Sequence, residues 1–152
     1  MKKLLVANRG EIAVRIMRAA RELGIETVAV CSEADVDALH TRTADHFEII
    51  GPAPANKSYL VIANVIDAAI RSGADAVHPG YGFLSERAEF AERLAANNLI
   101  FVGPSPAAIT QMGDKAQAIK AAIAAGVPTI PGSNGPVGSI EDAVIVAART
   151  GY

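Results

Sequence analysis

The chain is poor in aromatic residues and nearly free of cysteine. It has no tryptophan, and aromatic residues make up 5% of its 152 positions. The single cysteine, Cys31, has no partner for a disulfide within the chain. Its place at the end of an apolar run suits a small buried side chain better than a reactive thiol. A fold held together by disulfides is therefore excluded.

The sequence also lacks an excess of charge of one sign and a long hydrophobic run. The formal net charge is -2 and no basic stripe occurs, so nothing favours binding to nucleic acid or to an anionic membrane. The apolar residues 4–7 are interrupted at Asn8 well before they reach the length of a signal-peptide core. We therefore expect a cytoplasmic protein that binds neither nucleic acid nor membranes.

Short apolar runs alternate with amphipathic stretches over residues 1–102, and this alternation predicts βαβ units and a parallel sheet. Five strands are predicted, at residues 3–7, 27–31, 47–50, 74–77 and 99–102. Apolar residues recur with helical spacing between some of these strands. The helices predicted there span residues 11–23, 59–72 and 85–96. The expected fold class is α/β, with helices packed on an open parallel sheet.

The remainder of the chain is predicted to contain helices and a linker. Asp114 can cap a helix start, with Gln117 reaching back from the third position. Residues 128–139 are rich in proline, glycine and serine, which indicates a linker. The amphipathic helix predicted at residues 140–149 lacks the strand expected to follow it. This predicts that the chain stops inside a second folding unit.

The turn Asn8-Arg9-Gly10-Glu11 follows the first predicted strand, where a doubly wound sheet places its first ligand-binding turn. It lacks the three spaced glycines that let a backbone approach a pyrophosphate, so NAD is not expected here. Glu11 at the helix start would repel an anion but stabilise the helix dipole. The residues alone favour a structural turn.

The most unusual stretch is residues 78–86, His-Pro-Gly-Tyr-Gly-Phe-Leu-Ser-Glu, directly after the fourth predicted strand. Gly80 and Gly82 permit backbone conformations closed to other residues, so a substrate could lie against the main chain there. The alternative is a glycine-bent loop whose aromatic residues plug the core and whose Ser85 caps a helix. The residues alone do not favour either reading.

Two sets of charged residues are candidates for binding. Lys115 would lie in the first turn of a helix, where a lysine and backbone amides can hold a phosphate; a lone lysine is more often a solvated surface residue. Arg15, Arg18 and Glu22 recur on the polar side of the first predicted helix. They form either a solvated face with a weak Arg18 to Glu22 pair or a polar subunit contact.

Six strings occur in order along essentially the whole chain, and together they resemble biotin carboxylase. They are Ala7-Asn8-Arg9-Gly10-Glu11-Ile12-Ala13, Gly51-Pro52-Ala53-Pro54, Lys57-Ser58-Tyr59-Leu60, residues 78–86, Phe101-Val102-Gly103-Pro104 and Met112-Gly113-Asp114-Lys115.

The resemblance implies a Rossmann-like, doubly wound domain that precedes an ATP-grasp module. We accordingly predict an amino-terminal domain at 1–112, a connecting helix and linker at 113–130, and the beginning of the ATP-grasp module at 131–152. In this family the complete enzyme uses MgATP and bicarbonate to carboxylate biotin on a carrier domain, as part of acetyl-CoA, propionyl-CoA or pyruvate carboxylases. Fatty acid biosynthesis is one process that such enzymes serve.

The resemblance also assigns roles to individual residues. Lys115 would contact the ATP phosphates, Tyr81 and Gly82 would lie near the biotin or bicarbonate pocket, and Glu86 would help to order that wall. Arg18 and Glu22, with Arg15 beside them, would lie on a face that resembles the family's dimer contact. The expected partners are the remaining ATP-grasp part, the biotin carboxyl carrier domain, the carboxyltransferase and a second copy of the chain.

The ATP-closing glycine-rich loop, the magnesium-binding glutamates and the bicarbonate-holding cations of the family would all follow Tyr152. Phosphoryl transfer depends on metal and charge clamps of that kind. We therefore expect this chain alone to hold no cofactor or metal tightly, to contain no catalytic residue and to have no carboxylase activity. The alternatives are a non-catalytic ligand or protein-interaction module and the first domain of another ATP-grasp ligase.

Overall fold

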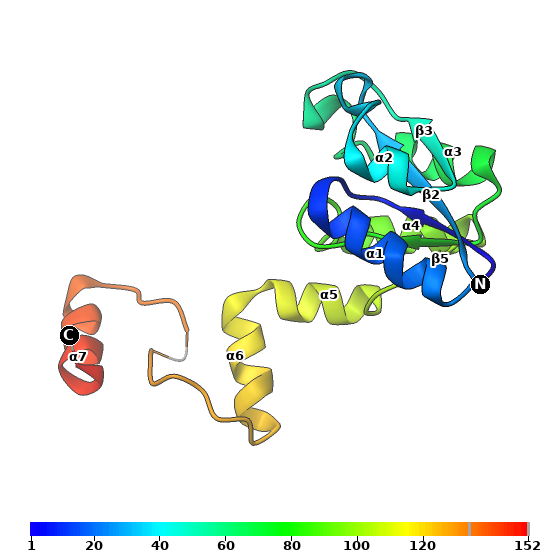
Figure 1. The fold of residues 1–152 in the computed structure, drawn as a ribbon. Helices are drawn as coiled ribbons and strands as arrows, with labels where there is room; N and C mark the ends of the chain where they lie inside the picture. Colours follow the sequence, from blue (N-terminus) through cyan, green and yellow to red (C-terminus); the bar gives the residue numbers. More distant parts are fainter. Residues whose placement is uncertain (134, 152) are drawn as a thin grey trace. The chain divides into compact units, whose positions relative to one another are not determined.

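The computed structural model describes residues 1–133 and 135–151 and divides into two compact units, Met1–Pro106 and Ala107–Tyr152. The first unit is built on a parallel five-stranded sheet with strand order β3-β2-β1-β4-β5 (Figure 1). Its elements are β1 (Lys3–Val6), α1 (Gly10–Glu22), β2 (Glu26–Cys31), the 3-10 turn η1 (Glu33–Asp35), α2 (Leu39–Thr43), β3 (His46–Ile49), the 3-10 turn η2 (Ala55–Lys57), α3 (Ile62–Ser72), β4 (Ala76–His78), α4 (Ala88–Ala96) and β5 (Ile100–Phe101).

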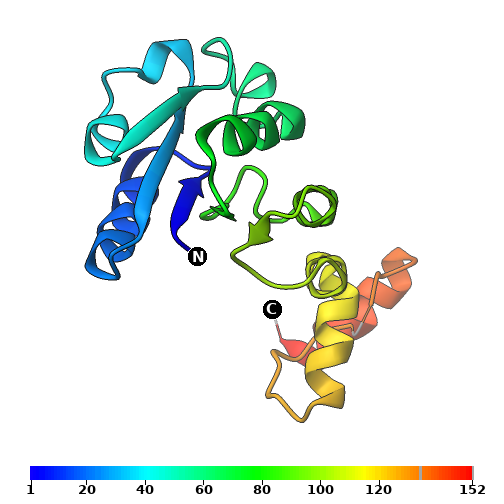
Figure 2. The same cartoon turned by 90° about the vertical axis from the view of Figure 1, so that its right-hand side faces the viewer.

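Helices cover both faces of the sheet because alternate strand residues point to opposite sides. Leu4 and Val6 of β1 pack toward α1, in a cluster that includes Met17 and Ala20. Leu5 packs in the other cluster, with residues of α3 and α4. Figure 2 shows α1 on one side of the strands and α3 and α4 on the other. The predicted α/β class and doubly wound arrangement are confirmed.

The structure explains the places of the cysteine and of two glycines in the sequence. Cys31 is 0% exposed at the end of β2, as a small buried side chain, and burial together with the charge of Asp35 raises the pKa of its thiol. Gly24 and Gly73 follow α1 and α3 with φ of +69° and +68°, the left-handed conformation that commonly ends helices. Two apolar residues with helical spacing are nevertheless exposed: Leu23, which follows the last residue of α1, is 75% exposed, and Ile70, at the edge of the buried face of α3, is 54% exposed.

Two helices begin later than predicted. The predicted helix 59–72 begins at Ile62, because Tyr59 is instead turned into the core by a tertiary contact and is 1% exposed. The predicted helix 85–96 begins at Ala88, with Arg87 rather than Ser85 at the capping position. The preceding turn contains Gly82 at φ +65° and Phe83 at φ +45°, and this left-handed backbone is incompatible with a right-handed helix.

The second unit contains most of α5 (Pro106–Gly113) together with α6 (Lys115–Ala124) and α7 (Ile140–Thr150). Asp114 caps α6 as predicted, with its Oδ1 accepting a 2.9 Å hydrogen bond from the Gln117 amide. The described part of residues 128–139 holds no helix or strand before α7, as expected of a linker, while Asn134 lies outside the described residues. The more detailed division at residues 112 and 130 stays a prediction. No helix within the described residues is long and apolar enough to cross a membrane.

Candidate functional site

The carboxyl ends of β1 and β4 meet where the strand order of the sheet reverses. The chain leaves β1 toward β2 on one side, while β4 pairs with β1 on the other. Val6 lies opposite His78, and the Ala7 amide donates a 2.9 Å hydrogen bond to the His78 carbonyl. Open parallel sheets bind their ligands outside such a switch point. The turns at residues 8–11 and 78–83 are therefore brought together at the expected position of a ligand.

Asn8 joins these two turns from within the protein. Its Nδ2 atom donates 2.8 Å hydrogen bonds to the carbonyl oxygens of both Pro79 and Tyr81, and its Oδ1 accepts one from the Arg9 amide. The residue is 3% exposed. Its amide therefore uses both donors and the acceptor, which fixes its orientation and ties the turn at residues 79–81 to the first turn.

Tyr81 extends from this anchored turn toward solvent. The side chain is 61% exposed, and its hydroxyl donates a 2.5 Å hydrogen bond to Oε1 of Glu11 in the first turn of α1. This hydrogen bond and the negative charge of Glu11 raise the pKa of the Tyr81 phenol. A shallow cavity of about 420 Å³ lies between the two turns and includes Gly82 in its lining. The tyrosine ring and the exposed Gly82 backbone thus form part of an open surface beside this cavity.

His78 supports the bend that precedes Tyr81. Its Nδ1 atom accepts a 3.0 Å hydrogen bond from the Gly80 amide, so the geometry assigns the ring proton to Nε2. Burial lowers the pKa of this histidine, which favours the neutral form that can accept. Gly80 has φ +66°, a conformation that leaves its amide facing the imidazole. The side chain of His78 thus serves the shape of the loop.

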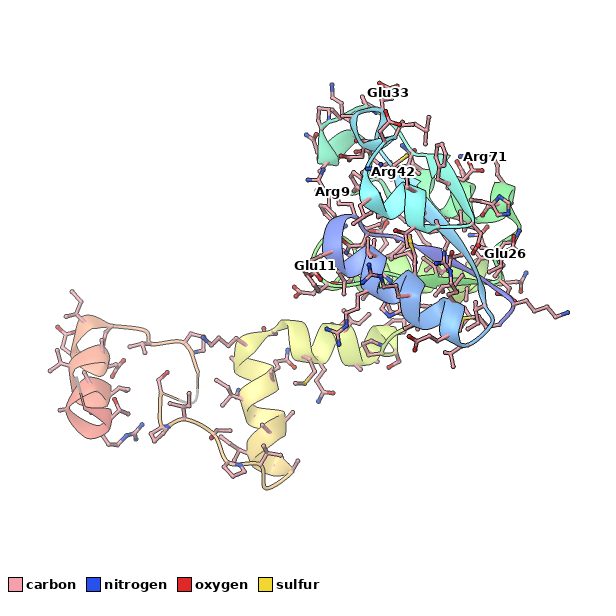
Figure 3. All side chains as sticks on the ribbon, in the orientation of Figure 1. Arg9, Glu11, Glu26, Glu33, Arg42 and Arg71 are labelled. Carbon is pink, nitrogen blue, oxygen red and sulfur yellow. The ribbon has the colours of Figure 1, made fainter. Side chains whose placement is uncertain are left out.

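Arg9 lies over two aromatic rings, those of Tyr59 and Phe83, next to the site. The rings of Tyr59 and Phe83 stack with centroids 5.3 Å apart, and the Arg9 guanidinium carbon lies 5.1 Å and 5.6 Å from the two centroids. Arg9 also forms an ion pair with Asp35 at 3.4 Å. Figure 3 shows Arg9 and Glu11 near the start of α1. One arginine therefore connects segments that follow four different strands.

Asp35 is the acceptor at the centre of this network. It receives hydrogen bonds from the Tyr59 hydroxyl at 2.6 Å and the Ser32 hydroxyl at 2.7 Å. Burial raises the pKa of Asp35, but these hydrogen bonds and the charge of Arg9 outweigh it and lower the pKa overall. The Tyr59 oxygen in turn accepts from the buried Ser32 amide at 3.0 Å. The network holds the connection after β2 against the loop that follows β3.

The charged residues predicted as a subunit contact lie on the exposed side of α1. Arg15, Arg18 and Glu22 line a groove of about 900 Å³ that also includes Leu39 and His40. The ion pairs found among the described residues do not include Arg18 with Glu22, so the weak pair considered above is not formed. The groove joins polar side chains to an apolar patch, because Leu39 is 61% exposed.

The other two predicted site residues are both exposed. Glu86 lies in the turn before α4, eight residues after His78 in the strand β4. Lys115 is the first residue of α6 in the second unit. Within the described part of the chain, no group of three or more histidine, cysteine, aspartate or glutamate residues could hold a metal ion.

Comparison with known proteins shows to which family this chain belongs. Residues 1–109 match the family model of the biotin carboxylase N-terminal domain. The chain belongs to the biotin carboxylase family. Biotin carboxylase 1 of Bacillus subtilis (strain 168) is 56% identical over 152 residues, which are 100% of this chain and 34% of that protein. The alpha subunit of mitochondrial methylcrotonoyl-CoA carboxylase from Glycine max is also 56% identical over 152 residues, 21% of its length. The chain thus spans 34% of the length of the first of these relatives and 21% of the second.

A solved structure extends the similarity to three dimensions. The biotin carboxylase domain dimer of Hydrogenobacter thermophilus 2-oxoglutarate carboxylase, in complex with MgADP, ADP and bicarbonate, matches with a TM-score of 0.88 and 46% identity. The match covers 99% of this chain and 33% of that one. The family and the fold predicted from the sequence are confirmed. The roles of individual residues stay predictions.

The sequence alone does not reveal the contacts between the two turns. Its pattern predicts that Asn8 and Glu11 are parts of a structural turn, whereas the structure brings them to opposite ends of Tyr81. The available signal was topological: both strings follow apolar strands, and carboxyl ends of adjacent parallel strands meet at one edge. The sequence of a strand does not show which other strand it will lie beside. The pairing of these two turns therefore could not be predicted from residues 8–11 or 78–86 alone.

Proposed function

We propose that this chain supplies one wall of the active site of a biotin carboxylase, which carboxylates biotin with bicarbonate at the expense of MgATP. The observation that carries the proposal is the turn at Tyr81 and Gly82, held open at the switch point of the sheet in a member of this family. The names of its relatives and the MgADP and bicarbonate bound by a similar domain support the same reaction.

Within this wall, Tyr81 offers a flat, exposed ring and Gly82 an uncovered backbone, against which the ureido ring of biotin or a bicarbonate ion can lie. A glycine at this position lets the ligand approach the main chain closely. Glu86, at the end of the same loop, would help to order the wall. The chain's own contribution is therefore to bind and orient the acceptor.

Lys115 is proposed to hold the phosphates of MgATP. It is exposed in the first turn of α6, where the helix amino terminus and a lysine charge both favour an anion. MgATP supplies the phosphoryl group that activates bicarbonate when it is bound. The Mg²⁺ ligands that the family resemblance implies belong to the rest of the enzyme, of which this chain spans about a third. We propose that the chain alone is inactive for this reason.

The partners proposed for the chain are the remaining ATP-grasp part of the enzyme, a biotin carboxyl carrier domain, a carboxyltransferase and a second copy of the same domain. A similar domain forms a dimer, and relatives include subunits of larger carboxylases. Arg15, Arg18 and Glu22 on the α1 groove are proposed as part of the contact between copies. The cytoplasm remains the predicted location, although some relatives are named as mitochondrial or chloroplastic.

A chimera tests this proposed function directly. These 152 residues would replace the matching segment of Bacillus subtilis biotin carboxylase 1, to which they are 56% identical. We expect the chimera to carboxylate free biotin and to hydrolyse ATP only when bicarbonate and biotin are present. The 152-residue chain alone should do neither. A folded chimera without carboxylation, or turnover by the short chain that is lost in Lys115→Ala, would contradict the proposal.

A further inference from the structure

Tyr81 is held at both of its ends by residues of a single turn. Asn8 binds its main-chain oxygen at 2.8 Å, and Glu11, three residues further along, binds its phenolic oxygen at 2.5 Å. The first contact is partly buried and the second is exposed. Asn8 therefore fixes the position of the Tyr81 main chain, and Glu11 fixes the orientation of its ring.

The loop that carries Tyr81 needs such a restraint. Gly80, Gly82 and Phe83 all have positive φ, at +66°, +65° and +45°. Glycines on both sides of a residue give it wide conformational freedom, and an exposed ring has no packing of its own to hold it. Tyr81 is 61% exposed, so its neighbours in the core do not determine the direction of the ring.

Glu11 is suited to this task by its position in α1. It lies in the first turn of a helix of 13 residues whose next turn packs on the sheet, so its backbone is rigid. A carboxylate that accepts from a phenol forms a charge-assisted hydrogen bond, shorter and stronger than a neutral one. Its negative charge near the helix amino terminus is also favoured by the helix dipole.

We propose that Glu11 is a positioning residue that holds the ring of Tyr81 in place as the wall for biotin. This inference rests on the proposed function, because it concerns the same site. Glu11 acts through Tyr81 and does not itself contact the acceptor. The mutation of either residue should therefore affect the binding of biotin, with little effect on the binding of MgATP.

Kinetics of the chimera test the inference through a double-mutant cycle. Glu11→Ala is expected to raise the KM for free biotin about 3- to 10-fold, the range for loss of one hydrogen bond, while kcat and the KM for MgATP change by less than about 2-fold. Tyr81→Phe should have a similar effect. The double variant should be no worse than Tyr81→Phe alone, since both changes break the same hydrogen bond.

Conservative and control variants separate positioning from general charge effects. Glu11→Gln keeps a side-chain carbonyl that can accept from the phenol, so it should restore most of the affinity for biotin. Glu33→Ala removes another exposed glutamate, on η1, which Figure 3 shows well apart from Glu11, and should leave the KM for biotin unchanged.

A spectroscopic readout on the 152-residue chain does not depend on catalysis. Ultraviolet difference titration follows ionisation of the tyrosines, and Glu11→Ala should lower the pKa of Tyr81, since Glu11 raises it. Glu33→Ala should leave that titration as it is in the parent chain.

The outcomes distinguish this inference from the proposed function. An unchanged KM for biotin in Glu11→Ala, beside a raised KM in Tyr81→Phe, would overturn the positioning role and leave the wall intact. Additive effects of the two changes would overturn it as well, because Glu11 would then act independently of Tyr81. An active chimera in which neither change affects the KM for biotin would also overturn the positioning role, since Tyr81→Phe keeps the ring and removes only the hydrogen bond. An inactive chimera would refute the proposed function as a whole.

Discussion

Gly80 faces Asn8 so closely that a side chain at Gly80 has no room: a Cβ atom there would lie 2.7 Å from Nδ2 of Asn8. Asn8, which holds the loop after β4 by hydrogen bonds, thus also excludes any residue larger than glycine at position 80. The two turns of the site are matched in shape as well as in hydrogen bonding, which explains how segments 71 residues apart form one rigid wall.

Gly80→Ala is expected to lower the free energy of unfolding by about 2 to 4 kcal/mol, because the new methyl group meets Asn8 and the positive φ is strained. Gly24→Ala is a matched control, with φ +69° and open space around the new Cβ. It should cost about 1 kcal/mol for the backbone alone. Urea denaturation measures both. In an Asn8→Ala background the excess cost of Gly80→Ala should shrink, and equal costs at Gly80 and Gly24 would contradict the close approach.

Arg9→Lys is expected to destabilise the chain by about 1 kcal/mol, since an ammonium group keeps the charge but not the planar contact with Tyr59 and Phe83. Arg9→Ala should cost slightly more, because the exposed ion pair with Asp35 is also lost. Arg42→Ala, an exposed arginine of α2, serves as the control. Chemical denaturation should show no loss for Arg42→Ala, and an equally small loss for Arg9→Ala would argue against the stacking.

Tyr59→Phe should cost about 1 to 3 kcal/mol at pH 7, because Asp35 loses a donor and the buried Ser32 amide loses its acceptor. The Asp35 part of this loss depends on pH. Since the folded pKa of Asp35 lies below its ordinary value of 3.8, its stabilising effect is present above about pH 4 and disappears as the pH falls through the folded value. The gap between parent and variant should therefore narrow below pH 4. Denaturation curves from pH 7 to pH 3 check this, and a gap that widens in acid would contradict it.

Lys115→Ala in the chimera is expected to raise the KM for MgATP about 10-fold or more, as expected when a cation that holds phosphates is removed. Lys120→Ala, an exposed lysine on the same helix, should leave it within about 2-fold. Steady-state kinetics with varied MgATP compares them. Equal effects of the two changes would reduce Lys115 to an ordinary surface residue.

Arg18→Glu is expected to weaken dimers of the chimera. The new carboxylate and that of Glu22 would then both lie on the face proposed as the contact, where like charges repel. In a two-fold symmetric contact the same patches meet, so Arg18→Glu combined with Glu22→Arg should restore part of the association. Arg93 lies on α4, which packs against the opposite face of the sheet, so Arg93→Glu should not change the dimer fraction. Analytical ultracentrifugation reports the dimer fraction. Equal dissociation by the Arg18 and Arg93 variants would place the contact elsewhere.

Most of the fold was predictable because its signals are local. Most of the strands are short apolar runs, and the glycines at positions 24 and 73 end helices by their left-handed conformation. Of the two helix starts that were predicted wrongly, one is decided by contacts across the chain. Tyr59 leaves the predicted helix because its hydroxyl reaches Ser32 and Asp35, 27 and 24 residues away.

The site was predictable only in part, for the same reason. Tyr81 and Gly82 were identified because their string is unusual and resembles the family, whereas Asn8 and Glu11 form contacts more than 69 residues along the chain. The small helix α2 was missed altogether, since its five residues have too few positions to show a helical period. Its buried His40 is held instead by the carbonyl of Val30 at 3.2 Å.

The most direct test of the account is the KM for free biotin in the chimera carrying Tyr81→Ala, compared with its KM for MgATP. If the turn at Tyr81 forms the wall for the acceptor, the KM for biotin rises about 10-fold or more and that for MgATP stays within about 2-fold of the parent. If both constants stay at their parent values in a folded, active chimera, biotin does not lie against this edge of the sheet, and the proposed role of Tyr81 is wrong.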